Sequence, residues 1–404
     1  MNTKYKIIND PVHGFISISS PEILRLIDHP FFQRLRYISQ MGLSYLVYPG
    51  AHHTRLQHAI GAMYLMNRAV DVLRTKNIQI SDEEKEAVMS AILLHDIGHG
   101  PFSHALEYAI IQNIRHETLS MVIMEQLNRE LNGRLDLALS IFKDEYPKKF
   151  LHELISSQLD TDRLDYLQRD SFFTGVIEGR INAERIIEML NVSDNLLTVD
   201  EKGIYSVEKF IVSRRFMYWQ VYFHKTSFMF EKILEQTLRR AKILFQSGTH
   251  IFLDNDLKFF FEKNHFQPDE ETLMQFAKIT DADILIHLKK WTTHSDKILS
   301  FLAKTIIERK PMKIEISPVP FDEAVIKEIK EKSKRYFSIN DSEVSYLVLH
   351  GEMSHIAYDR AQNPIRIQMK TGELKEFSET TDYSYIRALS HKVSKFYLIY
   401  AKNL

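Results

Sequence analysis

Apolar residues recur at helical spacing along most of the first 310 residues. Residues 21–40 carry one apolar stripe, which is interrupted near Pro30. Another stripe begins after Thr54, whose hydroxyl suits a helix N-cap. Helices are also expected over 82–95, 102–130, 151–170 and 207–246. Because an apolar position every three to four residues is typical of an amphipathic helix, the pattern predicts a mainly helical core.

Alternating apolar positions predict short strands in three parts of the chain. Residues 4–18 fit two strands around a turn at Asp10–Gly14, and residues 195–206 fit a hairpin that turns at Glu201–Gly203. After Pro311, strands are expected at 312–319, 344–350, 355–358, 365–369 and 373–377, with one charged helix at 321–336. The expected fold is mainly α with short β-hairpins, comprising a helical core at 1–310 and a small α+β lobe at 311–404.

The composition is that of an ordinary soluble globular protein. Its 404 residues are 44% hydrophobic and 26% charged, and the formal net charge is −1. That charge gives no bulk attraction to nucleic acid or to an anionic membrane, and we find neither an apolar run of 18 residues nor a signal peptide. We expect a cytoplasmic protein. The absence of cysteine fits that compartment and leaves His, Asp and Glu as the side chains for a metal site.

Residues 91–104 hold the strongest chemical signal in the chain, AILLHDIGHGPFSH. An apolar run leads into His95–Asp96, and two glycines and a proline then indicate that the helix ends. His58 and Asp162 come from two other predicted helices. Two imidazoles and two carboxylates would suit one divalent ion per chain, namely Zn²⁺, Fe²⁺, Mn²⁺, Ni²⁺ or Mg²⁺. Additional Mg²⁺ could arrive with the phosphates of a substrate.

Two further patterns have both a structural and a functional interpretation. Arg214, Tyr218, Tyr222 and Lys225 fall within about 80° on a helical wheel. They fit either aromatic packing of an amphipathic helix or a surface for a phosphorylated, base-bearing ligand. The neighbours of Asp162 at 160, 165 and 169 are expected to be solvated or ion-paired. No GxxxxGK[ST] loop is present, so the chain has no P-loop nucleotide site.

Several segments together resemble the SAM-and-HD-domain deoxynucleoside triphosphate triphosphohydrolases of the HD superfamily. They are NDPVHGFI at 9–16, FFQRLRYISQMG at 31–42, YPGAHHTRLQHAIG at 48–61, LLHDIGHGPFSH at 93–104, DTDRLDYLQRD at 160–170 and YFHK at 222–225. The resemblance covers roughly residues 5–250 and implies an HD-domain helical core. Since no SAM domain is expected, the chain is similar to the shorter, bacterial dGTPase-like type.

The resemblance implies hydrolysis of a dNTP to the deoxynucleoside and inorganic triphosphate. The implied metal ligands are His58, His95, Asp96 and Asp162. The implied catalytic residues are His116, its acidic partner Glu107, and His99. The implied substrate contacts are Gln40, Arg55, His99, His104, Arg163, Tyr166, Asp170, Arg214, Tyr218 and Tyr222. Among these, Tyr166 would leave no room for a ribose 2′-hydroxyl, and Gln40 and Asp170 would contact the 3′-hydroxyl.

A regulatory nucleotide site between subunits is also implied by the family. Lys6, Asp28, Gln33 and Arg36 match its base and phosphate contacts, although an Asp28–Arg36 ion pair would be a purely structural alternative. A homo-oligomer, either a dimer or a tetramer, is expected, with the C-terminal lobe serving assembly. Neither a membrane nor nucleic acid is required as a partner.

Two alternatives remain open from the sequence. The first is an HD phosphohydrolase that acts on other nucleotides, such as a monophosphate or a cyclic dinucleotide. The second is a nucleotide-sensing or nucleic-acid-binding protein without turnover. The excess of Arg and Lys near the motifs favours a polyphosphate substrate over the first, and the intact set of metal ligands argues against the second.

Overall fold

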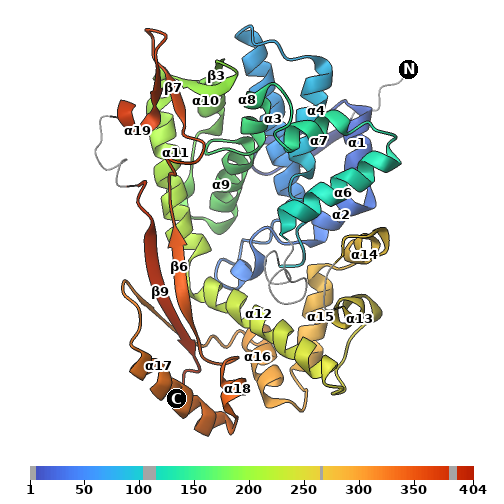
Figure 1. Cartoon of the computed structure of the whole chain (residues 1–404), viewed down its shortest axis with the longest axis vertical. Coiled ribbons are helices and arrows are strands. Elements are labelled where there is room, and N and C mark those ends of the chain that lie inside the picture. The colour runs from blue at the N-terminus through green and yellow to red at the C-terminus, as the bar shows by residue number, and fades with distance from the viewer. Residues whose placement is uncertain (1–5, 103–114, 264–266, 382–388) are drawn as a thin grey trace.

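The computed structural model describes residues 6–102, 115–263, 267–381 and 389–404. Helices make up most of it, which confirms the predicted mainly α class. In Figure 1 the helices up to α10 form one body, α12 leads from it to α13–α16, and two long C-terminal strands run along one side. None of the helices in these described ranges is long and apolar enough to cross a membrane.

Three helices form the centre of the core. α3 spans Arg55–Thr75, α4 spans Asp82–Leu94 and α9 spans Thr161–Thr174, and α3 packs against both of the others. Capping boxes at Thr54 and Ser81 fix where α3 and α4 begin, as the sequence predicted for Thr54. The three helices therefore bring the residues near their ends to one region of the core.

The N-terminal segment covers one side of this core. β1 (Lys6–Asp10) and β2 (Gly14–Ile18) form the predicted antiparallel hairpin. α1 spans Pro21–Asp28 and α2 spans Pro30–Gln33, so the expected break near Pro30 is confirmed. The helix predicted to reach residue 40 instead ends in a 3-10 turn at Arg34–Tyr37.

Two of the long helices predicted from the sequence are each divided in two. The helix expected over 151–170 is interrupted after α8 (Lys149–Ile155), because the Asp160 carboxylate accepts from the Ser157 and Arg163 backbone N–H groups and starts α9 anew. The helix expected over 207–246 consists of α11 (Ile204–Met217), a π-turn at Tyr218–Tyr222 and α12 (Lys225–Gln246). The π-turn places its aromatic residues beside the cavity described below, and π-turns are often found at functional sites.

The predicted hairpin turn at Glu201–Gly203 is wrong. β3 (Leu190–Ser193) and β4 (Leu196–Asp200) pair around Asp194 and Asn195, which both adopt a positive φ. Asp and Asn tolerate this left-handed conformation better than most residues, so this pair was the turn signal. Residues 201–203 form a 3-10 turn that leads into α11.

The remaining described α-helices of the first 310 residues lie either around α3 and α4 or, for α13–α16, next to α12 (Figure 1). They are α6 (His116–Glu130), α7 (Asp136–Phe142), α10 (Ala183–Glu188), α13 (Asn255–Glu262), α14 (Glu270–Phe276), α15 (Asp281–Trp291) and α16 (Lys297–Ile307). α6 is part of the helix that was expected over 102–130, and residues 103–114 lie outside the described ranges.

The C-terminal segment contributes to two sheets. β5 (Lys313–Ser317), β9 (Val393–Tyr400) and β6 (Leu349–His355) form one antiparallel sheet in that order, flanked by α17 (Glu323–Phe337) and α18 (Asp341–Val344). β7 (Arg366–Gln368) pairs in parallel with β4 and is followed by β8 (Leu374–Glu376) and α19 (Phe377–Thr380). The strand predicted at 344–350 begins only at Leu349 and runs on to His355, so that of the strand predicted at 355–358 only the first residue is in a strand. The division of the chain at 310/311 stays a prediction.

Candidate metal centre and substrate pocket

Three helices of the core deliver the four predicted metal ligands to one point. His58 lies one turn into α3, His95 and Asp96 follow the last residue of α4, and Asp162 is in the first turn of α9. His58 Nε2 and His95 Nε2 lie 3.0 and 3.4 Å from the same atom, Asp162 Oδ1. Asp96 lies 3.4 Å from His95 Nε2 and 3.8 Å from His58 Nε2.

The three separations of 3.0, 3.4 and 3.4 Å match the edges of a coordination shell, whereas the 3.8 Å between Asp96 and His58 Nε2 is longer. Ligands about 2.1 Å from a divalent ion lie roughly 3.0–3.5 Å from one another in octahedral or tetrahedral geometry. The Nε2 atoms of His58 and His95 are buried, and neither makes a hydrogen bond of acceptable geometry. Buried ring nitrogens normally have a partner, so their convergence on Asp162 fits a shared ion.

The opposite side of each ring sets its orientation. His58 Nδ1 donates to Asp165 Oδ2 at 2.8 Å, and His95 Nδ1 donates to the Ile92 carbonyl oxygen at 2.6 Å. With the proton held on Nδ1, each Nε2 lone pair faces the centre, which is the arrangement that metal-binding histidines usually show. The described residues therefore offer a divalent ion the oriented imidazoles of His58 and His95 and the carboxylate of Asp162, with the Asp96 carboxylate close by.

The electrostatics of this centre favour a positive charge. Burial alone would lower the pKa of His58, but the Asp162 and Asp165 carboxylates raise it to about 10. The pKa of His95 is also raised, against the effect of burial, by Asp96 and Asp162. Burial would raise the pKa of Asp162, but the two imidazoles hold it below its usual value. Without an ion, a proton supplies the missing positive charge.

Metal binding should therefore strengthen as the pH rises. In the metal-free protein, the folded-state pKa of His58 lies above its unfolded value of about 6.5. The proton thus stabilises the folded state below pH 6.5, and that stabilisation is lost as the pH rises through about 10. Because an ion must displace this proton, apparent affinity should rise by up to tenfold per pH unit, roughly, for each proton released. We expect the increase in Tm given by a fixed Mn²⁺ concentration to be larger at pH 8 than at pH 6; an equal or smaller increase at pH 8 would contradict this reasoning.

A second group of imidazoles lies on the other side of Asp96. His99 Nε2 is 3.4 Å from Asp96 Oδ1, and the His99 and His116 rings stack with centroids 3.8 Å apart. Burial, and then the charge of Arg55, lower the pKa of His99 well below its usual value, so that His99 is neutral. His116, the first residue of α6, is thus brought beside the centre, and its catalytic role stays a prediction. His104 and Glu107 lie outside the described residues, so the predicted His116–Glu107 pairing stays a prediction.

The three predicted phosphate-binding arginines have partners on the protein. Arg55 Nη1 donates to Asp96 Oδ2 at 2.5 Å, and Arg163 pairs with Asp160. Arg214 Nη1 donates to Gln158 Oε1 at 3.1 Å and to the carbonyl oxygen of Ala357 at 3.3 Å. Arg55 lines the cavity described next, whereas Arg163 and Arg214 are not among its lining residues.

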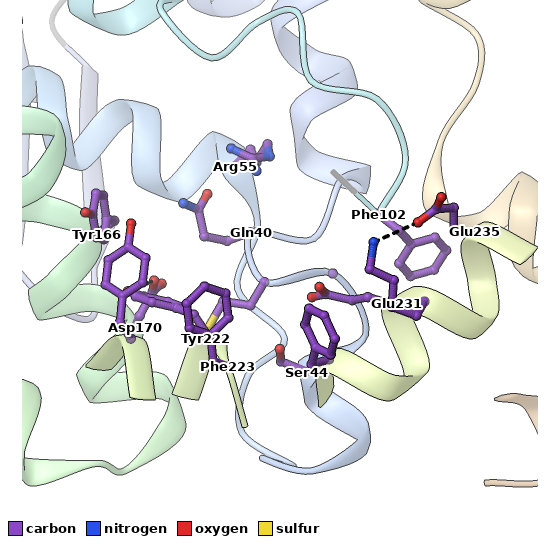
Figure 2. A pocket seen from close by; sticks show the side chains of 15 residues that line it. Gln40, Ser44, Arg55, Phe102, Tyr166, Asp170, Tyr222, Phe223, Glu231 and Glu235 are labelled. Atoms are coloured by element: carbon purple, nitrogen blue, oxygen red, sulfur yellow. Dashed lines mark hydrogen bonds and ion pairs between the residues drawn. The ribbon is translucent and has the colours of Figure 1, made fainter. Parts of the chain in front are cut away.

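A cavity of about 450 Å³ opens beside the centre (Figure 2). Six of the predicted substrate contacts line it, and they are Gln40, Arg55, Tyr166, Asp170, Tyr218 and Tyr222. Figure 2 shows Tyr166, Asp170 and Tyr222 at one end, and Phe102, Glu231 and Glu235 at the other. Lys225, at the start of α12, is exposed and is not among the lining residues. Of the predicted four-residue stripe, only Tyr218 and Tyr222 line the cavity.

Asp170 is held in place at the end of the cavity that Tyr166 and Tyr222 line. The Tyr222 hydroxyl donates to Asp170 Oδ2 at 2.7 Å, and His53 Nε2 donates to Asp170 Oδ1 at 2.7 Å. His53 is buried and stacks on Phe173. His53 was not predicted as a site residue, because a histidine directly before a helix carries no spacing signal.

A contact from the C-terminal segment also supports the cavity wall. The ring of His355, at the end of β6, stacks on Tyr218 with centroids 3.5 Å apart. Burial, together with Arg214 and Arg215, lowers the pKa of His355 to about 3, so the ring stays neutral. Nothing in the sequence connected His355 with Tyr218, which lies 137 positions earlier (355 − 218).

One buried carboxylate outside the recognised motifs organises two loops of the site. Asp281, in the first turn of α15, accepts from the Ser39 N–H at 2.8 Å and from the Phe102 N–H at 2.7 Å. Ser39 precedes Gln40, and Phe102 lines the cavity. Buried Arg34 holds the same region by donating to the carbonyl oxygen of His99 at 2.7 Å.

The four residues predicted to form a regulatory nucleotide site do not make the Asp28–Arg36 ion pair that was the structural alternative. Lys6 Nζ lies 3.2 Å from Asp28 Oδ1, and Arg36 Nη2 donates to Gln33 Oε1 at 3.1 Å. No Asp28–Arg36 ion pair is found among these described residues. Lys6 and Asp28 line a surface cavity of about 710 Å³, whereas Gln33 and Arg36 do not. A regulatory role for these four residues stays a prediction.

Comparison with known proteins identifies the family. Residues 55–170 match the HD domain, and residues 181–250 match the HD associated region. The uncharacterized protein YwfO of Bacillus subtilis (strain 168) is 33% identical over 395 residues, which cover 92% of this chain and 87% of YwfO. A crystal structure of a phosphohydrolase from Bacteroides thetaiotaomicron VPI-5482 has a TM-score of 0.95 and 48% identity, over 99% of this chain and 100% of that one. The chain belongs to the HD-domain phosphohydrolases, which are metal-dependent enzymes.

Within this family the chain is similar to deoxynucleoside triphosphate triphosphohydrolases. SAMHD1 of Homo sapiens is 31% identical over 280 residues, which cover 58% of this chain and 44% of the human protein. SAMHD1 of Gallus gallus is 29% identical over 287 residues. The chain thus spans about half or less of the length of these relatives. The family resemblance predicted from the motifs is confirmed.

Proposed function

We propose that this phosphohydrolase hydrolyses dNTPs to the deoxynucleoside and inorganic triphosphate. The observation that carries the proposal is that the metal centre and a nucleoside-sized cavity share one helix. Asp162 faces the centre, and Tyr166, one turn later on α9, lines the cavity. Arg55 joins the two, because it lines the cavity and bonds Asp96.

The triphosphate would lie between the cavity and the centre. Arg55 and the neutral His99 flank Asp96 and can both donate to phosphate oxygens. Arg163 follows Asp162 directly and would exchange its Asp160 partner for a phosphate. Arg214 would act at a greater distance, since it lines no part of the described cavity.

The deoxynucleoside would occupy the aromatic end of the cavity. Asp170 can accept from a sugar 3′-hydroxyl, since each of its oxygens has a lone pair besides those used by His53 and Tyr222. The Tyr166 and Tyr222 rings lie 6.2 Å apart, edge to face, and would form two walls around the sugar and base. Gln40 lines the same cavity and offers an amide to the sugar.

The proposed reaction breaks one phosphorus–oxygen bond. Water adds to the α-phosphorus and loses a proton, the bond to the 5′-oxygen breaks, and the 5′-oxygen gains a proton. A divalent ion held by His58, His95, Asp96 and Asp162 supplies Lewis-acid polarisation and a lowered pKa of water when bound. His116 would give the proton to the 5′-oxygen. Its stacked neighbour His99 is the weaker candidate, because the low pKa of His99 leaves the His99 ring without an acidic proton to give up.

Tyr166 should exclude ribonucleotides by occupying the space of a 2′-hydroxyl. Burial, and next the neighbouring Tyr218, raise the pKa of Tyr166 well above its usual value, so the phenol stays neutral and its role is steric. Tyr166→Ala should reduce the preference for dGTP over GTP by about 10–100-fold in kcat/KM. Tyr166→Phe is the matched control, because it keeps the ring and should keep the preference. A preference that is unchanged in the alanine variant would mean that another group excludes the hydroxyl.

The reaction class can be tested by separating products after incubation with each dNTP. A deoxynucleoside and inorganic triphosphate would support the proposal. A nucleoside monophosphate with pyrophosphate would indicate cleavage at another bond. Turnover only of monophosphates or cyclic dinucleotides would favour a different activity of the family, and tight dNTP binding without turnover would favour a sensor.

A further inference from the structure

Behind the metal ligand His58 lies a buried charge cluster, formed by Asp165, Arg169, Asp10 and His13. Asp165 Oδ2 accepts from His58 Nδ1 and from Arg169 Nε, both at 2.8 Å. Asp165 Oδ1 accepts from Arg169 Nη2 at 2.9 Å and from His13 Nε2 at 2.6 Å. The Asp165 and Arg169 side chains are both 0% exposed. Four donors thus satisfy a carboxylate that has no contact with solvent.

The cluster continues from Arg169 to the N-terminal hairpin. Arg169 Nη1 donates to Asp10 Oδ2 at 2.8 Å, and Arg169 Nη2 lies 3.3 Å from Asp10 Oδ1. Asp10 also accepts from the backbone N–H groups of Val12 and His13, each at 2.9 Å, and so closes the turn between β1 and β2. The hairpin is therefore connected through two ion pairs and one hydrogen bond to the ring of a metal ligand.

A glycine in α3 makes room for this cluster. Gly61 lies one turn after His58, and a Cβ added there would be 2.1 Å from Asp165 Oδ1 and 2.2 Å from Arg169 Nη2. Glycine is unfavourable inside a helix, so its presence in the middle of α3 fits a need for close approach. The close approach of α3 to Asp165 and Arg169 of α9 therefore depends on the absence of a side chain at Gly61.

Stability alone is a weak reason to bury such a cluster. Removing charged groups from water is costly, and a buried ion pair is often no more stabilising than apolar side chains of the same volume. A specific orientation is what this arrangement does provide. Because the Asp165 carboxylate can only accept, it fixes the proton of His58 on Nδ1 and holds the Nε2 lone pair toward Asp162.

We propose that Asp165 is a positioning residue for the metal ligand His58, and that Arg169 and Asp10 make the N-terminal hairpin part of the metal centre. The proposal rests on the proposed metal centre but not on the dNTP substrate. It implies that substitutions at Asp10, which does not touch His58, weaken metal binding. Residues that only stabilise the fold would not have this effect.

The experiment is a Co²⁺ titration of the full, metal-stripped chain, followed by calorimetry and by visible absorption of the bound ion. Asp165→Asn retains the shape of the side chain but offers one acceptor oxygen and a competing donor. We expect its Kd for Co²⁺ to rise about 10–100-fold with a changed spectrum. Asp10→Asn should raise the Kd several-fold with a smaller spectral change. Asp71→Asn is the matched control, since it removes the Lys85 partner from the same helix α3 and should leave both readouts unchanged.

A folded Asp165→Asn protein with wild-type Co²⁺ affinity and spectrum would overturn the proposal. If Asp165→Asn does not fold, the test passes to Asp10→Asn. An Asp10→Asn protein with wild-type Co²⁺ affinity would overturn the proposed coupling between the hairpin and the metal centre. Wild-type protein that binds one Co²⁺ but turns over no dNTP would contradict the proposed substrate alone. The two proposals can therefore fail separately.

Discussion

Asp96→Ala should remove both metal binding and hydrolysis. Asp96 lies 3.4 Å from His95 Nε2 and 3.4 Å from His99 Nε2, and it bonds Arg55. Its loss would take one carboxylate from the centre and release the arginine that joins the centre to the cavity. We expect turnover to fall by at least about 10³-fold, with metal content near zero after desalting.

The control for this substitution is again on the surface of α3. Asp71→Ala removes a carboxylate that pairs with Lys85 and should retain metal and turnover. Elemental analysis and thermal melting of both variants separate loss of metal from loss of fold. Wild-type metal content in a folded Asp96→Ala protein would contradict the assignment of this ligand.

His116→Ala should lower kcat by about 10²–10⁴-fold while metal content and dNTP affinity remain near those of the wild type. A 5′-alkoxide is a poor leaving group, so protonation of that oxygen should limit the rate. His116 stacks on His99 and lies in a group with Asp96 and His99, apart from His58, His95 and Asp162, so its removal leaves those three residues in place.

The comparison that isolates the proton is between His116→Ala and His116→Gln, which can donate a hydrogen bond but cannot transfer a proton. Both should be slow in single-turnover measurements, and equilibrium binding of a dNTP should be retained. If His116→Ala keeps a kcat near that of the wild type, the acid lies elsewhere, and His99 or a water at the metal centre becomes the next candidate.

Local chemistry accounts for what the sequence predicted well. The capping residue Thr54 and the apolar run before His95 located α3 and α4 correctly, because caps and periodicity act within a few residues. That His58, His95–Asp96 and Asp162 lie close together was predictable for a similar reason, since each lies near a recognisable helix end; their role as metal ligands stays a prediction. Two histidines and two aspartates at such positions also fit few sites other than a metal site.

Tertiary contacts account for what the sequence did not predict. The break before α9 depends on the Asp160 cap. The π-turn at Tyr218–Tyr222 divides a helix although the helical spacing of apolar residues in the sequence shows no break there. Asp165 and Arg169 were expected to be either solvated or ion-paired. They are ion-paired and completely buried, and that burial depends on how closely α3 and α9 approach each other. Long-range contacts such as that of His355 with Tyr218 leave no local pattern.

The position at which water enters the products tests the central claim most directly. The protein would be incubated with a dNTP and a divalent ion in H₂¹⁸O, and the products would be examined by mass spectrometry. We predict one ¹⁸O in inorganic triphosphate and none in the deoxynucleoside, with no reaction after removal of the metal. Label in the deoxynucleoside, or release of pyrophosphate or monophosphate in place of triphosphate, would contradict the account.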